Sequence, residues 1–185
     1  HLPLVRGLNF HLYGDYGLNV FNSRSLAYLK DKELESACVS FELRFAQIRD
    51  LKKVLRAEAI VYGRLPLMIT ENCLVQNETG CRLNRQGPCV PEDGPCRCGQ
   101  PNVLVDRTGA AFPLLPAYGH RTEIQNSKPL YLADRPEHRR LGLAYARLRF
   151  TTETAEECVS VVQNYLDAAP AAGDFTRGLY ERGVE

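Results

Sequence analysis

The sequence predicts an α/β fold with a parallel sheet, and two features lead to this expectation. Short apolar runs alternate with stretches of helical periodicity over the first seventy residues. In addition, "SACVSFEL" (36–43) is a nearly continuous apolar run, which is typical of a strand covered on both faces. Strands that alternate with helices of this length indicate repeated βαβ units, and such units often close into a (βα)8 barrel.

The elements expected before residue 70 follow these runs in order. Residues 7–13 and 18–22 are expected to be strands, and residues 23–34 a short helix. A second helix follows the strand described above and ends near Arg56, and residues 57–63 are the next strand. The second helix is expected because its apolar side chains share one face, namely Phe45, Ile48, Leu51, Val54 and Leu55.

The stretch 71–101 breaks this pattern. It has no hydrophobic period and contains four prolines and five of the chain's seven cysteines. A loop of this length in a compact domain is usually functional or disordered, so we expect something to hold it. A hairpin is predicted over 102–115 with its turn at Thr108–Gly109, and Pro113 suggests that this hairpin lies at an exposed edge.

The last predicted elements are a strand at 143–150 and a helix after it. Thr154 and Glu157 can form a capping box at the start of this helix. Cys158 falls in its apolar stripe and is expected in the core. The stripe consists of Cys158, Val161, Val162, Tyr165 and Leu166.

At 185 residues the chain is long enough to bury the core of about one domain. It opens on His1, and we expect it to be a piece of a longer protein. We divide it into four segments: βα units (1–70), a cysteine-rich insertion with a hairpin (71–142), the last strand and helix (143–170) and an exit segment (171–185).

The formal net charge is +1, from 23 basic and 22 acidic residues. Such a balance gives no global field for nucleic acid or an anionic membrane, so an RNA partner would be met locally or through missing domains. No long apolar run and no leader sequence is apparent, so no membrane partner is expected. The clustered, odd number of cysteines favours metal ligation in a reducing, cytoplasmic compartment.

The clustered cysteines favour ligation of a metal or an iron–sulfur cluster, because thiolates bind both. There is no CxxC pair: the gaps between successive cysteines are seven, seven, six and one residues. This spacing fits a zinc ribbon poorly and suits a larger object such as a cluster. Cys38 lies within a predicted strand and is expected in the core. The available donors are Cys73, Cys81, Cys89, Cys96, Cys98 and, after the hairpin, His120.

Six stretches spread over nearly the whole chain carry a family resemblance, namely "ELRFAQIRDLKK", "EAIVYGRLPLMITENC", "LVDRTGAAFPL", "HRTEIQNSKPLYLADR", "RLRFTTE" and "TRGLYERGVE". In sequence and order they resemble motifs of the U32 peptidase family. The resemblance implies the later half of a (βα)8 TIM-type barrel, with the cysteine-rich loop inserted at the carboxyl mouth of the barrel. The N-terminal half of the barrel would then be a partner, and the isolated fragment is expected to form a homodimer, rearrange or aggregate.

Members of this family were first named collagenase-like peptidases, yet the better understood ones look like hydroxylases. The resemblance implies a 4Fe-4S cluster on four cysteines. It also implies hydroxylation of a base of transfer or ribosomal RNA, or of a ubiquinone precursor, without molecular oxygen. Prephenate is implicated as the source of oxygen in some members.

The same resemblance carries ligand roles to Cys73, Cys81 and Cys98, with Cys96 as an alternative third ligand. His120 stands where the family's fourth cysteine usually lies. It makes a site of three cysteines and one histidine plausible for zinc as well as for a cluster. Alternatively, Cys89 or Cys96 supplies the fourth thiolate.

Polar residues at strand ends are further candidates, since barrel chemistry occurs there. Alternation places Arg147 and Arg149 on one face, where they can bind a dicarboxylate or phosphate, or else pair with Glu42 or Glu58. These four are the candidate catalytic residues. Arg64 and Glu153 are weighed as further candidates at strand ends. Asn126 and Ser127 are expected to organise a turn.

Peptide hydrolysis has little support in these residues, because neither H-E-x-x-H nor G-x-S-x-G is present. Peptidase activity and a zinc-stabilised, non-catalytic module are therefore the alternatives to a cluster-dependent RNA hydroxylase.

Overall fold

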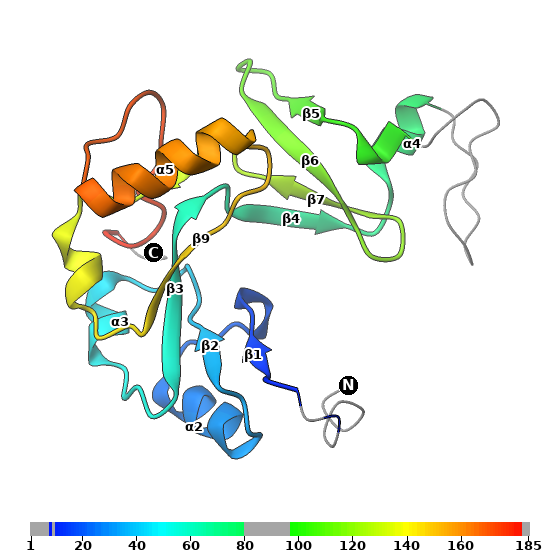
Figure 1. Cartoon of the computed structure of the whole chain (residues 1–185). Helices are drawn as coiled ribbons and strands as arrows, with labels where there is room; N and C mark the ends of the chain where they lie inside the picture. Colours follow the sequence, from blue (N-terminus) through cyan, green and yellow to red (C-terminus); the bar gives the residue numbers. More distant parts are fainter. Residues whose placement is uncertain (1–7, 9, 80–96, 183–185) are drawn as a thin grey trace. The chain divides into compact units, whose positions relative to one another are not determined.

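The computed structural model describes residues 8, 10–79 and 97–182, which form two compact units (Figure 1). One, the parallel-sheet unit, comprises His1–Gly63, Leu130–Arg149 and Ala155–Glu185. The other, the antiparallel-sheet unit, comprises Arg64–Pro129 and Phe150–Thr154. Most of the second unit thus follows β3 in the sequence and precedes the next strand of the first unit.

The parallel-sheet unit has β3 at its centre. β3 pairs in parallel with β2 and β9, and β2 pairs in parallel with β1. A short strand, β8, is antiparallel to the end of β3. This arrangement confirms the α/β class. The strands are β1 (Tyr13–Gly14), β2 (Ser36–Cys38), β3 (Arg56–Gly63), β8 (Leu130–Tyr131) and β9 (Tyr145–Leu148).

The described residues of this unit include three α-helices, and short polar contacts define the ends of two of them. Asn22 caps the first by accepting hydrogen bonds from the backbone N–H groups of Arg24 and Ser25. The second ends at Asp50, earlier than predicted, and Lys53 Nζ donates to the carbonyl of Ile48 at 2.6 Å. The helices are α2 (Ser23–Asp31), α3 (Phe45–Asp50) and α5 (Ala155–Asp167), with 3-10 turns η1 (Tyr16–Leu18) and η3 (Pro136–Arg140).

None of the helices in the described ranges is long and apolar enough to cross a membrane.

The core of the parallel-sheet unit is centred on β3, where every residue after Arg56 is buried. Cys38 is fully buried beside it, as the sequence predicts. The largest completely buried side chains come from strands, helices and loops alike, and include Leu26, Ile48, Ile60, Leu130, Leu132 and Tyr180. The continuous apolar runs therefore mark the centre of this unit.

The N-terminal strands are shorter than predicted. Of the expected strand at 7–13, Tyr13 alone pairs among the residues that the structure describes, and in place of the one at 18–22 a bridge joins Val20 to Val39. Phe10 and Tyr13 are 66% and 58% exposed. Apolar composition alone does not make a strand here, because β1 has a partner on one side only within the described residues.

The C-terminal helix is also less buried than its pattern suggests. α5 begins directly after Thr154, as expected, and Val161 is buried. Cys158 is only half-buried, whereas Val162 and Leu166 are 41% and 70% exposed. The prediction that Cys158 lies in the core is therefore wrong, because much of this stripe has no covering element in the described chain.

The tail after α5 packs on the core. Tyr180 is 1% exposed, stacks on Phe45 and donates a hydrogen bond to the carbonyl of Ile60 at 2.6 Å. Arg177 forms two parallel bonds with the carboxylate of Asp134, with Nη2 at 2.7 Å from Oδ2. The segment predicted as an exit from the domain is thus part of its packing up to the last described residue.

The described residues of the antiparallel-sheet unit form four strands in the order β4-β7-β6-β5, each antiparallel to its neighbour (Figure 1). Two of them, β4 and β7, have no counterpart in the sequence-based assignment. One face of the sheet is partly covered by α4 and η2. The elements are β4 (Pro66–Thr70), α4 (Leu74–Thr79), η2 (Arg97–Gly99), β5 (Asn102–Val105), β6 (Ala111–Ala117) and β7 (Arg121–Gln125).

The predicted hairpin over 102–115 is confirmed by the pairing of β5 with β6. Asp106 closes the turn by accepting bonds from the N–H groups of Thr108 and Ala110, and Gly109 has φ +83°. The expectation of an exposed edge at Pro113 is wrong, because β6 lies between β5 and β7. Pairing with β7 begins only at Leu114, so the missing N–H of Pro113 costs no bond to that strand.

Candidate thiol pocket and the polar face of the parallel sheet

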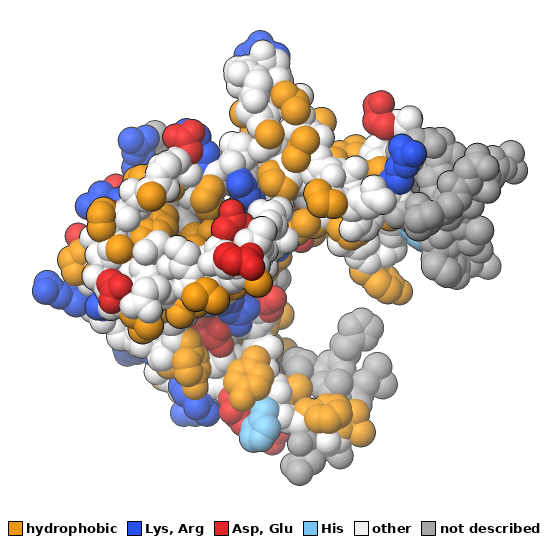
Figure 2. All heavy atoms as spheres, turned by 45° about the horizontal axis from the view of Figure 1, so that its top comes forward, with side chains coloured by type: hydrophobic (Ala, Val, Ile, Leu, Met, Phe, Trp, Pro, Cys, Tyr) orange, Lys and Arg blue, Asp and Glu red, His pale blue; other side chains and the backbone are white. Residues whose placement is uncertain are grey.

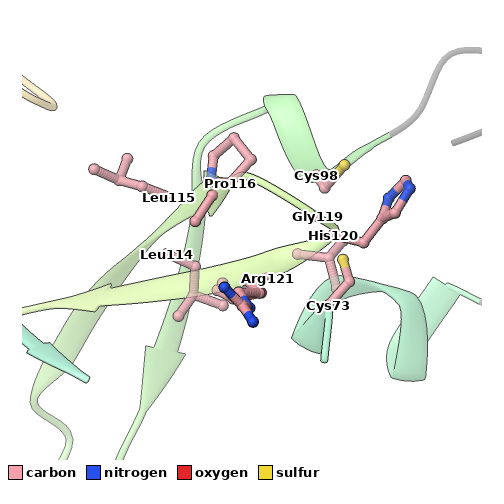
Figure 3. A pocket seen from close by; sticks show the side chains of 11 residues that line it. Cys73, Cys98, Leu114, Leu115, Pro116, Gly119, His120 and Arg121 are labelled. Carbon is pink, nitrogen blue, oxygen red and sulfur yellow. The ribbon is translucent and has the colours of Figure 1, made fainter. Parts of the chain in front are cut away.

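A cavity of about 290 Å³ lies in the antiparallel-sheet unit and is lined by two cysteines and a histidine. Figure 3 shows the sulfur atoms of Cys73 and Cys98 and the imidazole of His120 gathered at one end of this pocket. They come from three separate segments: the residue before α4, the turn η2 and the β6–β7 turn. The remaining wall is mostly small or apolar, with Leu114 and Leu115 among its residues, but also includes Arg121 and Thr122.

Cys73 is held in place by Thr122, a residue that sequence patterns do not single out. Thr122 Oγ1 accepts a hydrogen bond from the N–H of Leu74 at 3.1 Å, and Thr122 is itself buried. Thr70 Oγ1 donates to the carbonyl of Asn72 at 2.6 Å. These contacts fix the start of α4 against β7, and Cys73 is 5% exposed as a result.

Cys98 occupies the middle of η2. Asn102 Nδ2 donates to the carbonyls of Arg97 and Gln100 at 2.9 and 2.7 Å, which ties η2 to the start of β5. Cys98 is half-buried and packs against the small apolar core of this unit. That core consists of Cys73, Val75, Leu114 and Ile124.

His120 reaches the pocket from a turn with unusual backbone angles. Gly119 has φ +75° and His120 has φ +61°, in the left-handed region that non-glycine residues rarely adopt. The next residue, Arg121, contacts Glu71 Oε2 with Nε at 3.1 Å and Nη2 at 2.9 Å. This ion pair joins the turn to the segment that carries Cys73.

Two thiols and an imidazole are donors suited to zinc or an iron–sulfur centre. Cys38, Cys73, Cys98 and Cys158 all carry thiols rather than disulfides. Within the described ranges no three His, Cys, Asp or Glu side chains are close enough to hold a metal ion by themselves. The predicted ligand Cys81 and the alternates Cys89 and Cys96 lie outside the described residues. The residue types fit such a centre, but Cys73, Cys98 and His120 line one pocket without being close enough to hold a single ion together.

A second group of polar residues lies on one face of the parallel sheet. Glu58 is 6% exposed, and Arg147 approaches its Oε2 with Nη2 at 2.6 Å and Nε at 3.1 Å. Ser36 donates its hydroxyl to the same carboxylate, and the remaining nitrogen of Arg147 pairs with Asp15. The structure thus shows the pairing of Arg147 with Glu58 that was one of the two sequence-based interpretations.

The contact between Arg147 and Asp15 links distant parts of this sheet. Asp15 follows β1 and Arg147 is in β9, with β2 and β3 between them. The Arg147 side chain therefore lies across the sheet and contacts acidic side chains that belong to two other segments, Glu58 and Asp15.

Arg149 lies on the same face as Arg147. Its guanidinium carbon is 5.3 Å from the ring centre of Tyr16, and Nη2 is 3.4 Å from the phenol oxygen. Glu42 is half-buried in the turn after β2, and no contact described for its carboxylate joins it to either arginine. Burial raises the pKa of the Cys38 thiol on this sheet to about 12, so it is not a nucleophile near neutral pH.

The other candidate residues at strand ends form hydrogen bonds to backbone groups. Arg64 Nη1 donates to the carbonyl of Asn126 at 3.0 Å and also to that of Ser127. Glu153 accepts from the N–H groups of Thr151 and Thr152 at 2.7 and 3.0 Å. Asn126 Oδ1 accepts from the N–H of Lys128, which confirms that this residue organises a turn.

Comparison with known proteins supports one family. The model described as peptidase family U32 matches residues 5–106, which include β1 to β5 and the cysteine-rich stretch. No curated protein and no solved structure gave a match.

Proposed function

The chain belongs to peptidase family U32, and we propose that it forms part of an enzyme whose thiol pocket holds a 4Fe-4S cluster for hydroxylation of an RNA base. The observation that carries this proposal is the convergence of Cys73, Cys98 and His120 from three segments on one cavity. Two thiols that line one pocket without forming a disulfide are typical of metal or cluster ligands in a reducing compartment, which supports a cytoplasmic location.

In this proposal Cys73, Cys81, Cys98 and His120 are the four ligands, with Cys89 or Cys96 in place of His120 as the alternative. When bound, the cluster supplies one-electron redox chemistry. The chain's own contribution is positional: Thr122 and Asn102 hold the two thiol-bearing turns, and Leu114 and Leu115 form an apolar part of the pocket wall.

We also propose that the parallel-sheet unit is the later half of a (βα)8 barrel. Two facts support this: β1, β2, β3 and β9 are neighbouring parallel strands, and α2 and α3 separate the first three of them in sequence. The antiparallel-sheet unit follows the carboxyl end of β3, which in a barrel is the end where chemistry occurs. Arg147 and Arg149 lie on one face of the sheet, where a phosphate or dicarboxylate can compete with Asp15, whose side chain is 62% exposed.

Metal analysis of anaerobically prepared protein tests the pocket. We expect iron and sulfide with the visible absorbance of a cluster, and loss of both in Cys73→Ser, Cys98→Ser and His120→Ala. Cys158→Ser is the matched control, because that half-buried thiol belongs to α5. Zinc in place of iron would favour a zinc-stabilised module, and unchanged iron in the two cysteine variants would contradict the proposed ligands.

Activity separates hydroxylase from peptidase. The cluster-loaded chain, or the longer protein that contains it, is incubated with RNA, and its nucleosides are then analysed for the mass of one added oxygen. The family description favours peptidase activity as the second candidate, and digestion of casein or collagen after metal removal measures it. Proteolysis that survives Cys73→Ser, without modified nucleosides, would support the peptidase.

The unpaired edges of β1 and β9 among the described residues offer a test of the proposed half barrel. Each has a partner on one side only among the described residues, so we expect the isolated chain to dimerise or aggregate. Light scattering that finds a stable monomer, together with slow amide exchange in β1, would argue against a missing half.

A further inference from the structure

Two adjacent residues of one short turn contact the two arginines on the polar face of the parallel sheet. Asp15 pairs with Arg147, and the ring centre of Tyr16 lies 5.3 Å from the guanidinium carbon of Arg149. Tyr16 is the first residue of η1, and Asp15 caps that turn by accepting a hydrogen bond from the N–H of Tyr16 at 2.7 Å. A single turn thus meets both cations of this face.

Arg147 is held from one side, so that one of its nitrogens is left for a second partner. Its Nε and Nη2 lie 3.1 and 2.6 Å from Glu58 Oε2, and the same carboxylate accepts the hydroxyl of Ser36. Glu58 and Ser36 are both buried. Separation of a buried ion pair leaves an uncompensated charge in the interior, so Glu58 keeps the guanidinium in place. Nη1 is the nitrogen that contacts Asp15.

Asp15 is the exposed member of this ionic group. Its side chain is 62% exposed, against 28% for Arg147 and 8% for Glu58. An ion pair with one partner open to water contributes little to stability, because water competes for the carboxylate. Asp15 can therefore leave Arg147 at small cost, whereas Glu58 cannot.

The turn that carries Asp15 is loosely packed. None of the three residues of η1 is buried, Leu18 is 50% exposed, and no atom lies within 4 Å of a Cβ placed on Gly17. The ring of Tyr16 also lies 5.9 Å from that of Phe41. With so little burial, the contacts of Asp15 and Tyr16 contribute much of what ties the turn to the sheet.

The charges around the two arginines favour an anion at the place of Asp15. The carboxylates of Asp15 and Glu58 balance the two guanidinium groups, and exchange of Asp15 for an external anion preserves this balance. Figure 2 shows basic side chains scattered among acidic ones on the face that it draws, rather than gathered in one patch. Recognition would therefore depend on local donors more than on a broad field.

We propose that η1 is a gate over an oxyanion site, in which the carboxylate of Asp15 occupies the place that a carboxylate or phosphate oxygen of a ligand takes on Arg147 Nη1. Ligand binding exchanges the internal anion for the external one and releases the turn, while Glu58 keeps Arg147 in position. Asp15 is thus a built-in competitor that lowers the affinity of the site. This inference rests on the anion site of the proposed function, and not on the cluster or the reaction.

Titration of the full chain with inorganic phosphate, and separately with malonate, tests the competition at constant ionic strength. The side-chain N–H signals of arginine in NMR spectra report binding, and those of Arg147 and Arg149 should shift. We expect Asp15→Asn to bind the tighter of the two anions about three- to tenfold more strongly than the unaltered chain does. Asp31→Asn, in an exposed position at the end of α2, is the matched control and should change the affinity less than about twofold.

The direction of the change in Asp15→Asn separates a gate from a structural contact. If Asp15 served mainly to hold Arg147 for the ligand, its removal would weaken anion binding, and this result would overturn the proposal.

Amide exchange measures the turn itself. A saturating concentration of the bound anion should speed exchange in the peptide that contains residues 16–19 of the unaltered chain, because Asp15 no longer ties the turn down. In Asp15→Asn the same peptide should exchange quickly with or without the anion. Exchange that stays unchanged or slows in the unaltered chain on binding would mean that the turn is not a gate.

These measurements distinguish failure of the gate from failure of the anion site. If neither anion binds the unaltered chain or Asp15→Asn, the anion site of the proposed function is wrong, and the gate is wrong with it. If an anion binds both proteins with equal affinity, the site stands and the gate is wrong. Iron content decides neither result, because Cys73 and Cys98 belong to the other unit.

Discussion

In the parallel-sheet unit, every β3 residue after Arg56 is buried, whereas the outer strands of the antiparallel-sheet unit expose their apolar side chains. The first unit has a core drawn from strands, helices and the C-terminal tail. The buried hydrophobic cluster of the second has four members, and one of them is Cys73. A unit with so little apolar burial gains much from any further source of order, and the metal centre proposed above would be one.

Removal of metal should produce the largest difference in behaviour between the two units. In anaerobically prepared protein that contains iron, we expect a chelator to speed amide exchange in β4, β6 and β7 at least about tenfold, because local opening would no longer break metal bonds. Exchange in β3 should stay slow. Mass spectrometry of exchanged peptides measures both, and an equal loss of protection in the two units would mean that the comparison is mistaken.

A matched pair of leucine substitutions compares the burial of the two units. Leu130→Ala removes a completely buried side chain from β8 and should lower the free energy of unfolding by about 2–5 kcal/mol. Leu67→Ala in β4, where the side chain is 55% exposed, should change it by less than about 0.5 kcal/mol. Denaturant titration checks both values, and similar losses would show that β4 is covered in solution.

Gly63, the last residue of β3, is a smaller and purely backbone test. It has φ +119°, and an added Cβ would lie 2.0 Å from the carbonyl oxygen of Arg149. We expect Gly63→Ala to destabilise the parallel-sheet unit by about 1–3 kcal/mol. Gly17→Ala is the control, because no atom lies within 4 Å of a Cβ placed there. Thermal unfolding of the two variants should therefore differ clearly.

The ion pair that anchors the tail predicts a modest dependence on pH. Hydrogen bonds from Arg177 lower the pKa of Asp134 below its ordinary value of 3.8. A carboxyl whose pKa is lowered by folding stabilises the protein at any pH above its pKa in the unfolded state. This stabilisation is lost as the pH falls through its pKa in the folded state. Asp134→Asn should cost about 1 kcal/mol at pH 7 and show less further loss below about pH 4. If the difference in unfolding free energy between the unaltered protein and Asp134→Asn does not change during an acid titration, this role is contradicted.

The parallel-sheet unit was largely predictable from local patterns. The run at 57–63 identified the central strand, and the helix at 23–34 was correct apart from its end, since Asn22 and the apolar spacing are local signals. The N-terminal strands were predicted to be longer than they are, because apolar residues such as Phe10 remain exposed. Whether a neighbouring strand covers such a residue depends on the rest of the fold.

In the antiparallel-sheet unit the sequence identified residue types and missed their partners. The turn at Thr108–Gly109 was predictable, because Asp106 and Gly109 act within a few residues. β7 was not, because "RTEIQ" mixes charged and polar residues and becomes a strand only between β4 and β6. The role of Thr122 in holding Cys73 likewise depends on a contact between residues 48 positions apart.

By itself the sequence determined the α/β class, the central buried strand and the supply of sulfur donors, since period, turn residues and composition are local properties. Only the tertiary structure decided that Arg147 meets Glu58 and that Cys73, Cys98 and His120 share one cavity. Those side chains are brought together by pairing between strands distant in sequence, and no local pattern records which distant strands will pair.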